Sequence, residues 1–260
     1  MYPTLLLSES DNVLTISLNR PNVRNAFNDE VIADLTHLFK ELAKSPDLRM
    51  VILKGEGDAF SAGADLEWMK KAGQMSMDEN RDDALKLARM LELINQMPVP
   101  IVGLIHGYCF GGGLGLAAVC DYVLAAKDTL FSFSEVKLGL IPAVIGPFVL
   151  RKIGVSMARA LFISAERFDA QRAMQIRLVH QVLENKEKLG EAAAKLTKDI
   201  LSSSPQAVKA AKKFLQEIPA LSYQDQITRA ANTLSGLRGS EEAREGLSAF
   251  LEKRKPNWIK

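Results

Sequence analysis

Short apolar runs of strand length, separated by amphipathic helical segments, are the feature that most limits the folds open to this chain. In the first run, Leu14, Ile16 and Leu18 alternate with residues 13, 15 and 17, which is the period of a strand with one face more deeply buried. Regular alternation of strands with helices predicts an α/β fold. The predicted strands are residues 13–18, 50–53, 101–105 and 122–124. One predicted helix begins after Asn28, and a second extends over about 78–96.

The chain changes character after Glu135, where the pattern becomes mostly helical. Ser204 followed by Pro205 is typical of a helix start, and a further helix is predicted over about 240–253. A chain of 260 residues is long for one domain, so we expect a single α/β core with a helical appendage. The predicted division is 1–200 for the core and 201–260 for the C-terminal helices.

Composition excludes several classes of protein. Apolar residues make up 47% of the chain and charged residues 25%, which indicates a soluble globular protein with a buried core. A net charge of +2 provides no electrostatic footprint for nucleic acid, so RNA or DNA binding is not expected. Residues 99–120 carry no Lys, Arg, Asp or Glu, but Pro100, His106 and three consecutive glycines argue against a membrane span.

Cysteine usage and the N-terminal sequence suggest where the protein works. Cys109 and Cys120 are the only cysteines, and neither lies in a pair or cluster with metal-ligand spacing, so no metal site is predicted. The N-terminus lacks the basic region, apolar stretch and cleavage site of a signal peptide. We therefore expect a reduced, cytoplasmic setting.

Two glycine-containing turns carry the first chemical signal. Residues 60–66 read FSAGADL and lie between a strand and a helix that begins near Asp65, and residues 106–116 read HGYCFGGGLGL in a similar context. Each turn lets backbone approach a ligand, although a tight turn or close helix packing also explains either one alone. Two N–H groups from two turns are what thioester chemistry needs, because negative charge develops on the thioester oxygen. Removing one such donor typically slows an enzyme by about a hundredfold.

A carboxyl group in an apolar run carries the second signal. Residues 131–142 read FSFSEVKLGLIP, with Glu135 at the centre. Burial of Glu135 would raise its pKa and prepare the carboxyl group for proton transfer near neutral pH. The alternative interpretation is an exposed Glu135 on an edge strand, paired with Lys137.

The order of these motifs resembles the enoyl-CoA hydratase/isomerase, or crotonase, superfamily over nearly the whole chain. The resemblance implies a crotonase-like spiral of strand-strand-helix repeats, C-terminal helices that trimerise, and a homo-trimer or hexamer. It also implies an acyl-CoA thioester as substrate and no further cofactor, since coenzyme A is part of the substrate. Further matching segments are LNRP at 18–21 with Asn25-Ala26, Cys120-Asp121, AERFDA at 165–170, Leu178-Val179 and EGLSAFLEKRK at 245–255.

The same resemblance implies roles for particular residues. The N–H groups of Ala64 and Gly112 would form an oxyanion hole, and Glu135 would handle the proton at the substrate α-carbon. Lys253 would reach the coenzyme A of a neighbouring subunit. The full set implied for binding substrate and coenzyme A is Arg24, Ala62, Ala64, Asp65, Leu66, Tyr108, Gly112, Pro142, Phe250 and Lys253.

One departure from the family pattern bears on the reaction. Two-glutamate hydratases carry a second glutamate two residues after the GGG run, and Gly115 stands there in this chain. The glycine-rich stretch after Ile141-Pro142 is also altered, so a more apolar acyl pocket is expected. A single placed carboxyl group leaves two reactions open: hydration of an enoyl-CoA, or isomerisation by one base that moves a proton.

Gly115 and the sequences around Leu66, Pro142 and Arg167 look most like bacterial methylglutaconyl-CoA hydratases of leucine catabolism, which favours a lyase over an isomerase. A catalytically weak acyl-CoA binding protein remains the alternative from another class. In that case both turns would serve binding, while Glu135 would be structural.

Overall fold

The computed structural model describes residues 2–259, which form two compact units. The first unit comprises the chain up to Met97 together with Ile101–Ala193, and the second comprises Pro98–Pro100 together with the chain from Ala194 onward. The change of unit at Ala194 falls within one helix, α7 (Lys186–Leu201), where the predicted boundary near residue 200 also lies.

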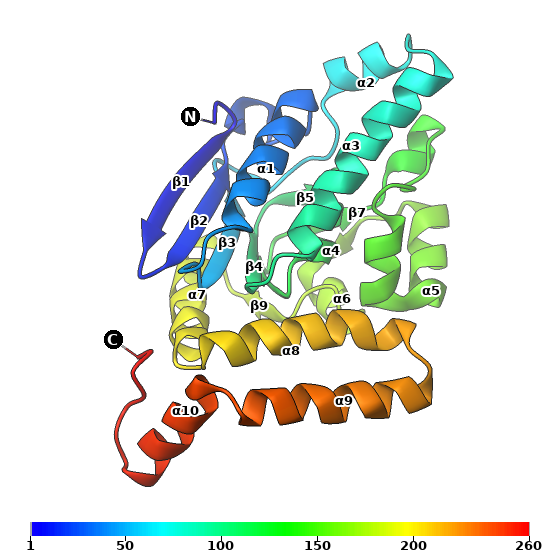
Figure 1. Ribbon diagram of the computed structural model, residues 1–260. Coiled ribbons are helices and arrows are strands. Elements are labelled where there is room, and N and C mark those ends of the chain that lie inside the picture. Colours follow the sequence, from blue (N-terminus) through cyan, green and yellow to red (C-terminus); the bar gives the residue numbers. More distant parts are fainter. Residues whose placement is uncertain (1, 260) are drawn as a thin grey trace. The chain divides into compact units, whose positions relative to one another are not determined.

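A six-stranded sheet forms the centre of the first unit, in the order β1-β2-β3-β4-β6-β9 (Figure 1). The pair β1/β2 is antiparallel and the others are parallel. A smaller sheet has the order β5-β7-β8. The strands are β1 (Leu5–Ser10), β2 (Val13–Leu18), β3 (Met50–Gly55), β4 (Ile101–Ile105), β5 (Tyr108–Phe110), β6 (Tyr122–Ala126), β7 (Leu130–Ser132), β8 (Phe168–Asp169) and β9 (Gln181–Leu183).

Burial explains why the central strands read as continuous apolar runs. All five residues of β4 are buried, and Gly103 of β4 pairs with Leu53 of β3 on one side and Val123 of β6 on the other. A parallel sheet covered on both faces has no solvent side that would require polar residues. The four predicted strands are confirmed as β2, β3, β4 and β6.

Capping residues set where the helices of the first unit begin. The side chain of Asn28 accepts a hydrogen bond from the N–H of Val31 (3.0 Å), as predicted for a helix start. Ser76 and Glu79 form a capping box at the second predicted helix. Helices α1 and α3 pack side by side (Figure 1). The helices are α1 (Asp29–Leu42), α2 (Leu66–Ala72), α3 (Met77–Asn95), α4 (Gly112–Val119), α5 (Gly146–Ser164) and α6 (Ala170–Gln175), with 3₁₀ helices η1 (Pro21–Val23) and η2 (Glu135–Leu138).

The second unit is helical. It contains α8 (Pro205–Glu217), the 3₁₀ helix η3 (Ile218–Ala220), α9 (Tyr223–Arg238) and α10 (Glu241–Leu251). Ser204 caps α8 and Pro205 is its first residue, as predicted. The ammonium group of Lys212 donates to the carbonyl of Val99 (2.9 Å), which fastens residues 98–100 to this unit.

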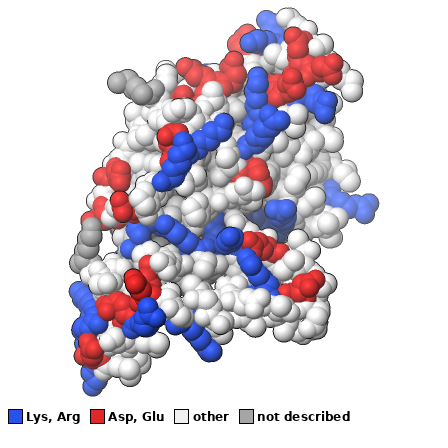
Figure 2. Space-filling view, in the orientation of Figure 1, with Lys and Arg blue, Asp and Glu red and all other residues white. Residues whose placement is uncertain are grey.

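Two observations on the described residues bear on membrane and nucleic-acid partners. No helix among residues 2–259 is both long enough and apolar enough to cross a membrane. On the face drawn in Figure 2, acidic side chains lie among the basic ones, in keeping with the net charge of +2.

Candidate active site

Two segments far apart in the sequence run in parallel and bring the two glycine turns together. Ser61 forms a parallel bridge with Cys109: its N–H donates to the carbonyl of Tyr108 (3.0 Å), and its carbonyl accepts from Phe110 (3.0 Å). Ala64 and Gly112 each follow this paired position by three residues. The register therefore places these two predicted oxyanion-hole residues at equivalent points of adjacent turns.

A glycine with positive φ precedes each of the two residues. Gly63 has φ +99° and Gly111 has φ +45°. A Cβ atom on Gly63 would lie 3.3 Å from the carbonyl oxygen of Phe110, and one on Gly111 would lie 3.7 Å from the Cα of Gly63. The turns are thus in contact, and both the dihedral angles and the space favour glycine.

The N–H of Ala64 is left free by the hydrogen bonds around it. The carbonyl of Gly63 accepts from the N–H of Phe27 (2.7 Å), and Asp65 donates to the carbonyl of Phe27 (2.8 Å). In a trans peptide the carbonyl and the next N–H point in opposite directions, so the N–H of Ala64 points away from Phe27. Within residues 2–259, it has no hydrogen-bond acceptor.

The N–H of Gly112 is free for a related reason. Gly112 is the first residue of α4, and the carbonyl of Gly111 accepts from Leu114 (2.9 Å) and Gly115 (3.3 Å). The Gly112 N–H in the same peptide therefore points outward from the helix N-terminus, where the helix dipole favours negative charge. The described part of the chain provides no acceptor for it.

Glu135 reaches the same place from the neighbouring strand. β7 pairs with β5, and Glu135 begins the 3₁₀ helix η2 three residues after β7 ends. Its Oε1 lies 3.3 Å from where a Cβ on Gly111 would be, and its Oε2 is buried without a hydrogen-bond partner among the described residues. Loss of solvent raises the pKa of Glu135 above its ordinary value. The alternative of an exposed Glu135 on an edge strand is wrong, because the chain leaves the sheet before residue 135 and folds the side chain inward.

Ala64, Gly112 and Glu135 line one cavity of about 720 Å³. The three residues predicted as catalytic are thus brought together, although they come from three separate segments. The rest of the wall is mostly apolar and includes Leu66, Trp68, Met69, Ala72, Leu138 and Leu140.

A second cavity of about 1050 Å³ shares Ala62, Ala64, Leu66 and Trp68 with the first. Basic, acidic and aromatic side chains line it, and the guanidinium of Arg24 lies 5.2 Å from the ring centre of Tyr108. Lys71 also lines this cavity. Arg24, Ala62, Asp65, Leu66 and Tyr108, all predicted to bind coenzyme A, therefore border one hollow.

Asp65 has a structural task within this hollow. Its carboxylate caps α2 by accepting from Glu67 (3.0 Å) and Trp68 (3.4 Å), and it pairs with Arg20 at 2.9 Å. Partial burial alone would raise the pKa of Asp65, but the hydrogen bonds from Arg20, Trp68 and Glu67 outweigh it and lower the pKa. Asp65 thereby fixes the start of α2, the helix that both cavities share.

Three of the predicted binding residues do not line either cavity. Pro142 is buried but absent from both walls. Phe250 and Lys253 belong to the second unit, and their role at a neighbouring subunit's coenzyme A stays a prediction.

Sequence reasoning missed several lining residues: Trp68, Met69, Lys71, Asn80 and Asp83. A helix starting at Asp65 was the available signal, because it places residues 68 and 69 about one turn, and residue 72 about two turns, beyond Ala64.

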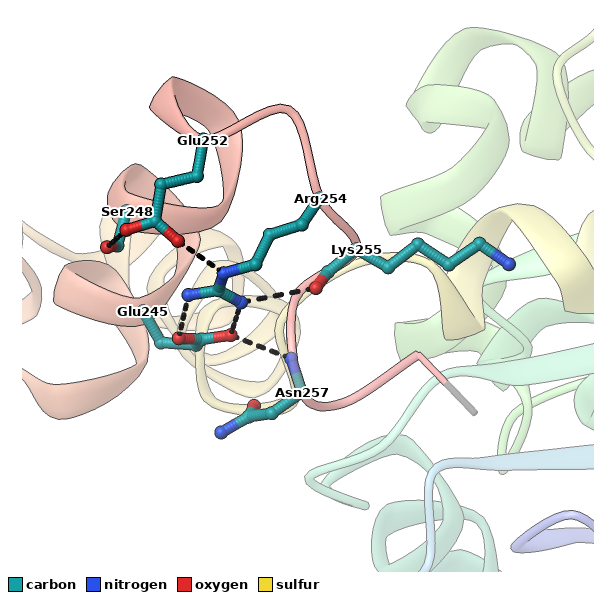
Figure 3. Close-up of polar contacts among 6 residues, drawn as sticks. All are labelled: Glu245, Ser248, Glu252, Arg254, Lys255 and Asn257. Carbon is teal, nitrogen blue, oxygen red and sulfur yellow. Dashed lines mark hydrogen bonds and ion pairs between the residues drawn. The ribbon is translucent and has the colours of Figure 1, made fainter.

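The end of the second unit holds Lys253 in a defined turn. Lys253 has φ +55°, and the guanidinium of Arg254 pairs with Glu252 (2.7 Å) and with both oxygens of Glu245 (2.6 and 2.8 Å), as Figure 3 shows. Hydrogen bonds from Arg254 and from the N–H of Asn257 lower the pKa of Glu245 to about 2. The residues on either side of Lys253 are therefore tied back to α10.

Gly115, the position of the second glutamate in two-glutamate hydratases, has no space for a side chain. A Cβ there would lie 2.5 Å from Cγ2 of Ile145 and 3.2 Å from Cδ1 of Leu91. Ile145 is itself buried. A carboxyl group at this position would require the core to move, so Glu135 is the acid that the fold presents beside the two turns.

The cavity combines free backbone N–H groups with a desolvated carboxyl group. Across residues 2–259, no group of three His, Cys, Asp or Glu side chains lies close enough together to hold a metal ion. Two free N–H groups and a desolvated acid in one cavity are typical of enzymes that stabilise a developing oxyanion.

Comparison with known proteins identifies the family. Residues 8–260 match the model of the enoyl-CoA hydratase/isomerase family. The chain is 31% identical to the 2,3-dehydroadipyl-CoA hydratase of Escherichia coli, over 98% of each chain. It is also 31% identical to the crotonyl-CoA hydratase of Syntrophomonas wolfei, over 99% of this chain and 98% of the relative. The crystal structure of an enoyl-CoA hydratase from Shewanella pealeana matches with a TM-score of 0.95 and 36% identity, over 99% of this chain and 97% of that one.

The chain therefore belongs to the enoyl-CoA hydratase/isomerase family of enzymes. The crotonase-like α/β fold predicted from the motifs is confirmed.

Proposed function

We propose that this enzyme adds water across the α,β double bond of an enoyl-CoA thioester. The observation that carries the proposal is the buried, unpartnered Oε2 of Glu135 in the cavity that also holds the free N–H groups of Ala64 and Gly112. Relatives named as hydratases support hydration over isomerisation.

The two amides act on the thioester oxygen. Attack of water at the β-carbon pushes electrons into the carbonyl, so negative charge grows on that oxygen during the reaction. The N–H groups of Ala64 and Gly112 donate to it, and the N-terminus of α4 adds the positive end of its dipole. Both donors are in place before the reaction begins, so no reorganisation is needed as the charge develops.

Glu135 moves the protons. Its carboxylate takes a proton from the attacking water as the water oxygen bonds to the β-carbon, and the resulting carboxyl group gives a proton to the α-carbon. The substrate gains one H and one OH, and Glu135 returns to its starting state. A raised pKa favours both halves of this cycle, because proton transfer is most effective when the group's pKa lies near the working pH.

The second cavity is the proposed site of the coenzyme A moiety. Arg24 and Lys71 supply positive charge for phosphate groups, and Tyr108 offers a ring face. Ala62 and Ala64 belong to both cavities, so a thioester placed at their junction would have its acyl group on one side and its nucleotide on the other.

We expect the purified enzyme to convert crotonyl-CoA to a hydroxyacyl-CoA that carries oxygen from isotopically labelled water, as measured by mass spectrometry. Isomerisation is the competing reaction, because Gly115 leaves one carboxyl group beside the turns and one base suffices for a double-bond shift. An isomerase would instead convert a 3-enoyl-CoA to its 2-enoyl isomer and leave crotonyl-CoA unlabelled. A protein that bound both thioesters and changed neither would be an acyl-CoA binding protein, and the hydratase proposal would fail.

We also propose a homo-trimer or hexamer with a contact through α10. Phe250 and Leu251 are 81% and 78% exposed and lie beside the exposed Leu247. Burying such side chains between subunits removes apolar area from water. Light scattering at micromolar concentration should give a mass of three or six chains, and Phe250→Glu should lower that mass. A strictly monomeric wild-type protein would contradict this assembly.

A further inference from the structure

We infer that the acyl cavity selects an uncharged acyl group and rejects one that ends in a carboxylate, with Asp83 as a determinant of that choice. The inference rests on the proposed function, because it concerns the acyl end of the same thioester. It separates two substrate classes that the named relatives span, since a 2,3-dehydroadipyl group ends in a carboxylate and a crotonyl group does not.

The charges on the cavity wall all have one sign. Among the described residues that line it, the ionisable side chains are Glu135 and Asp83, and none is Lys, Arg or His. Asp83 lies on α3, is half-buried and has no ion-pair partner within residues 2–259. A substrate carboxylate entering this space would meet like charges and lose water without gaining a cation.

The neutral polar groups do not compensate. Among the described residues of the wall, Asn80 has the one amide side chain, and its NH₂ donates to the carbonyls of Ala72 (3.0 Å), Met75 (3.2 Å) and Ser76 (3.2 Å). These bonds close the end of α2, so the donors of Asn80 are already used. The other side-chain donors on the described wall, the Trp68 indole and the Ser134 hydroxyl, carry no charge.

The apolar part of the wall favours a hydrocarbon chain. Leu66, Leu138 and Leu140 are 77%, 61% and 55% exposed, and a bound acyl chain would shield them from water. Burying one methylene group can raise affinity by up to about fourfold. A methylglutaconyl group carries a terminal carboxylate, so this selectivity differs from the expectation that the resemblance to methylglutaconyl-CoA hydratases raised.

The test compares two saturated thioesters of equal chain length, hexanoyl-CoA and adipoyl-CoA, which differ in the terminal carboxylate. Calorimetry on the wild-type enzyme should show hexanoyl-CoA binding at least about tenfold more tightly, because bringing like charges together in a binding site typically costs more than about tenfold in affinity. Asp83→Asn should narrow that ratio by at least about threefold, since it removes one of the two negative charges while keeping the side chain's shape.

Asp82→Asn is the matched control. Asp82 is the adjacent acid on the same helix, is exposed and does not line the cavity, so its removal changes the net charge equally and should leave the ratio unchanged. Equal or tighter binding of adipoyl-CoA to the wild type would overturn the inference. An identical ratio in Asp83→Asn and Asp82→Asn would overturn the role of Asp83.

The design separates this inference from the proposed function. Neither saturated thioester can be hydrated, so the binding ratio is independent of catalysis. If hexanoyl-CoA bound more tightly than adipoyl-CoA by the predicted ratio but crotonyl-CoA were not hydrated, the hydratase proposal alone would be refuted. Hydration of crotonyl-CoA with no preference between hexanoyl-CoA and adipoyl-CoA would refute the selectivity alone.

Discussion

Glu135→Gln is expected to lower kcat on crotonyl-CoA by at least about a thousandfold, within the usual range for acid-base catalysis. The amide keeps the shape of the side chain but cannot exchange a proton. The fold offers no second carboxyl group at Gly115 to take over, because Ile145 and Leu91 occupy that space. Binding of hexanoyl-CoA should stay within about threefold of wild type, since the loss belongs to the transition state. Steady-state kinetics and calorimetry on the same preparation measure both quantities.

The thermal stability of this variant provides its control. Because desolvation raises the folded-state pKa of Glu135, the folded protein binds more protons than the unfolded chain between the two pKa values, and wild-type stability falls as pH rises through the folded pKa. Gln carries no charge, so the variant lacks this loss. At about pH 8 it should melt at a higher temperature than wild type, because burial costs the charged carboxylate more hydration than it costs the neutral amide. The difference should shrink toward the ordinary carboxyl pKa of 4.5.

Two results would contradict the role of Glu135. Wild-type turnover in Glu135→Gln would show that the carboxyl group does not carry the proton. Loss of turnover in Glu67→Gln with full activity in Glu135→Gln would transfer the role to Glu67, which lines the second cavity.

The strands and the turns were predictable from the sequence because their signals are local. The apolar runs of β3 and β4 reflect burial on both faces, and the caps at Asn28 and Ser204 act within one helical turn. The glycines at 63 and 111 indicated that the backbone closely approaches a ligand or another segment of the chain. The residues with which they are in contact were not visible, because the pairing of Ser61 with Cys109 joins segments 48 residues apart.

The position of Glu135 shows where local reasoning stops. The run around residue 135 fits both a buried carboxyl group and an exposed edge strand, and the turn η2 after β7 decides between them. Asp83 and Asn80 were missed because a polar residue on an amphipathic helix normally faces solvent. α2 and α3 both contribute to the wall of the cavity, so these two residues line it. The space at Gly115 likewise depends on Ile145, which lies 30 residues further along the chain.

Gly63→Ala tests the oxyanion hole and is expected to lower kcat by about a hundredfold, the typical effect of losing one donor. Alanine disfavours φ +99°, and its Cβ would lie 3.3 Å from the carbonyl oxygen of Phe110. Relief of that strain rotates the backbone at residue 63, and the peptide that carries the N–H of Ala64 turns with it. Gly63 is a cleaner choice than Gly111, because a Cβ on Gly111 would also contact Oε1 of Glu135 at 3.3 Å.

Gly154→Ala is the matched control for this variant. Gly154 has φ +73° within the kink of α5, and a Cβ there would meet no atom within 4 Å, so the substitution strains the backbone without moving the turn at Ala64. Its kcat should stay within about twofold of wild type, while its melting temperature falls by an amount similar to that of Gly63→Ala. If both variants lost activity equally, general destabilisation would explain the loss. A loss confined to Gly63→Ala, with hexanoyl-CoA still bound, places the effect on the N–H that Ala64 donates to the developing oxyanion.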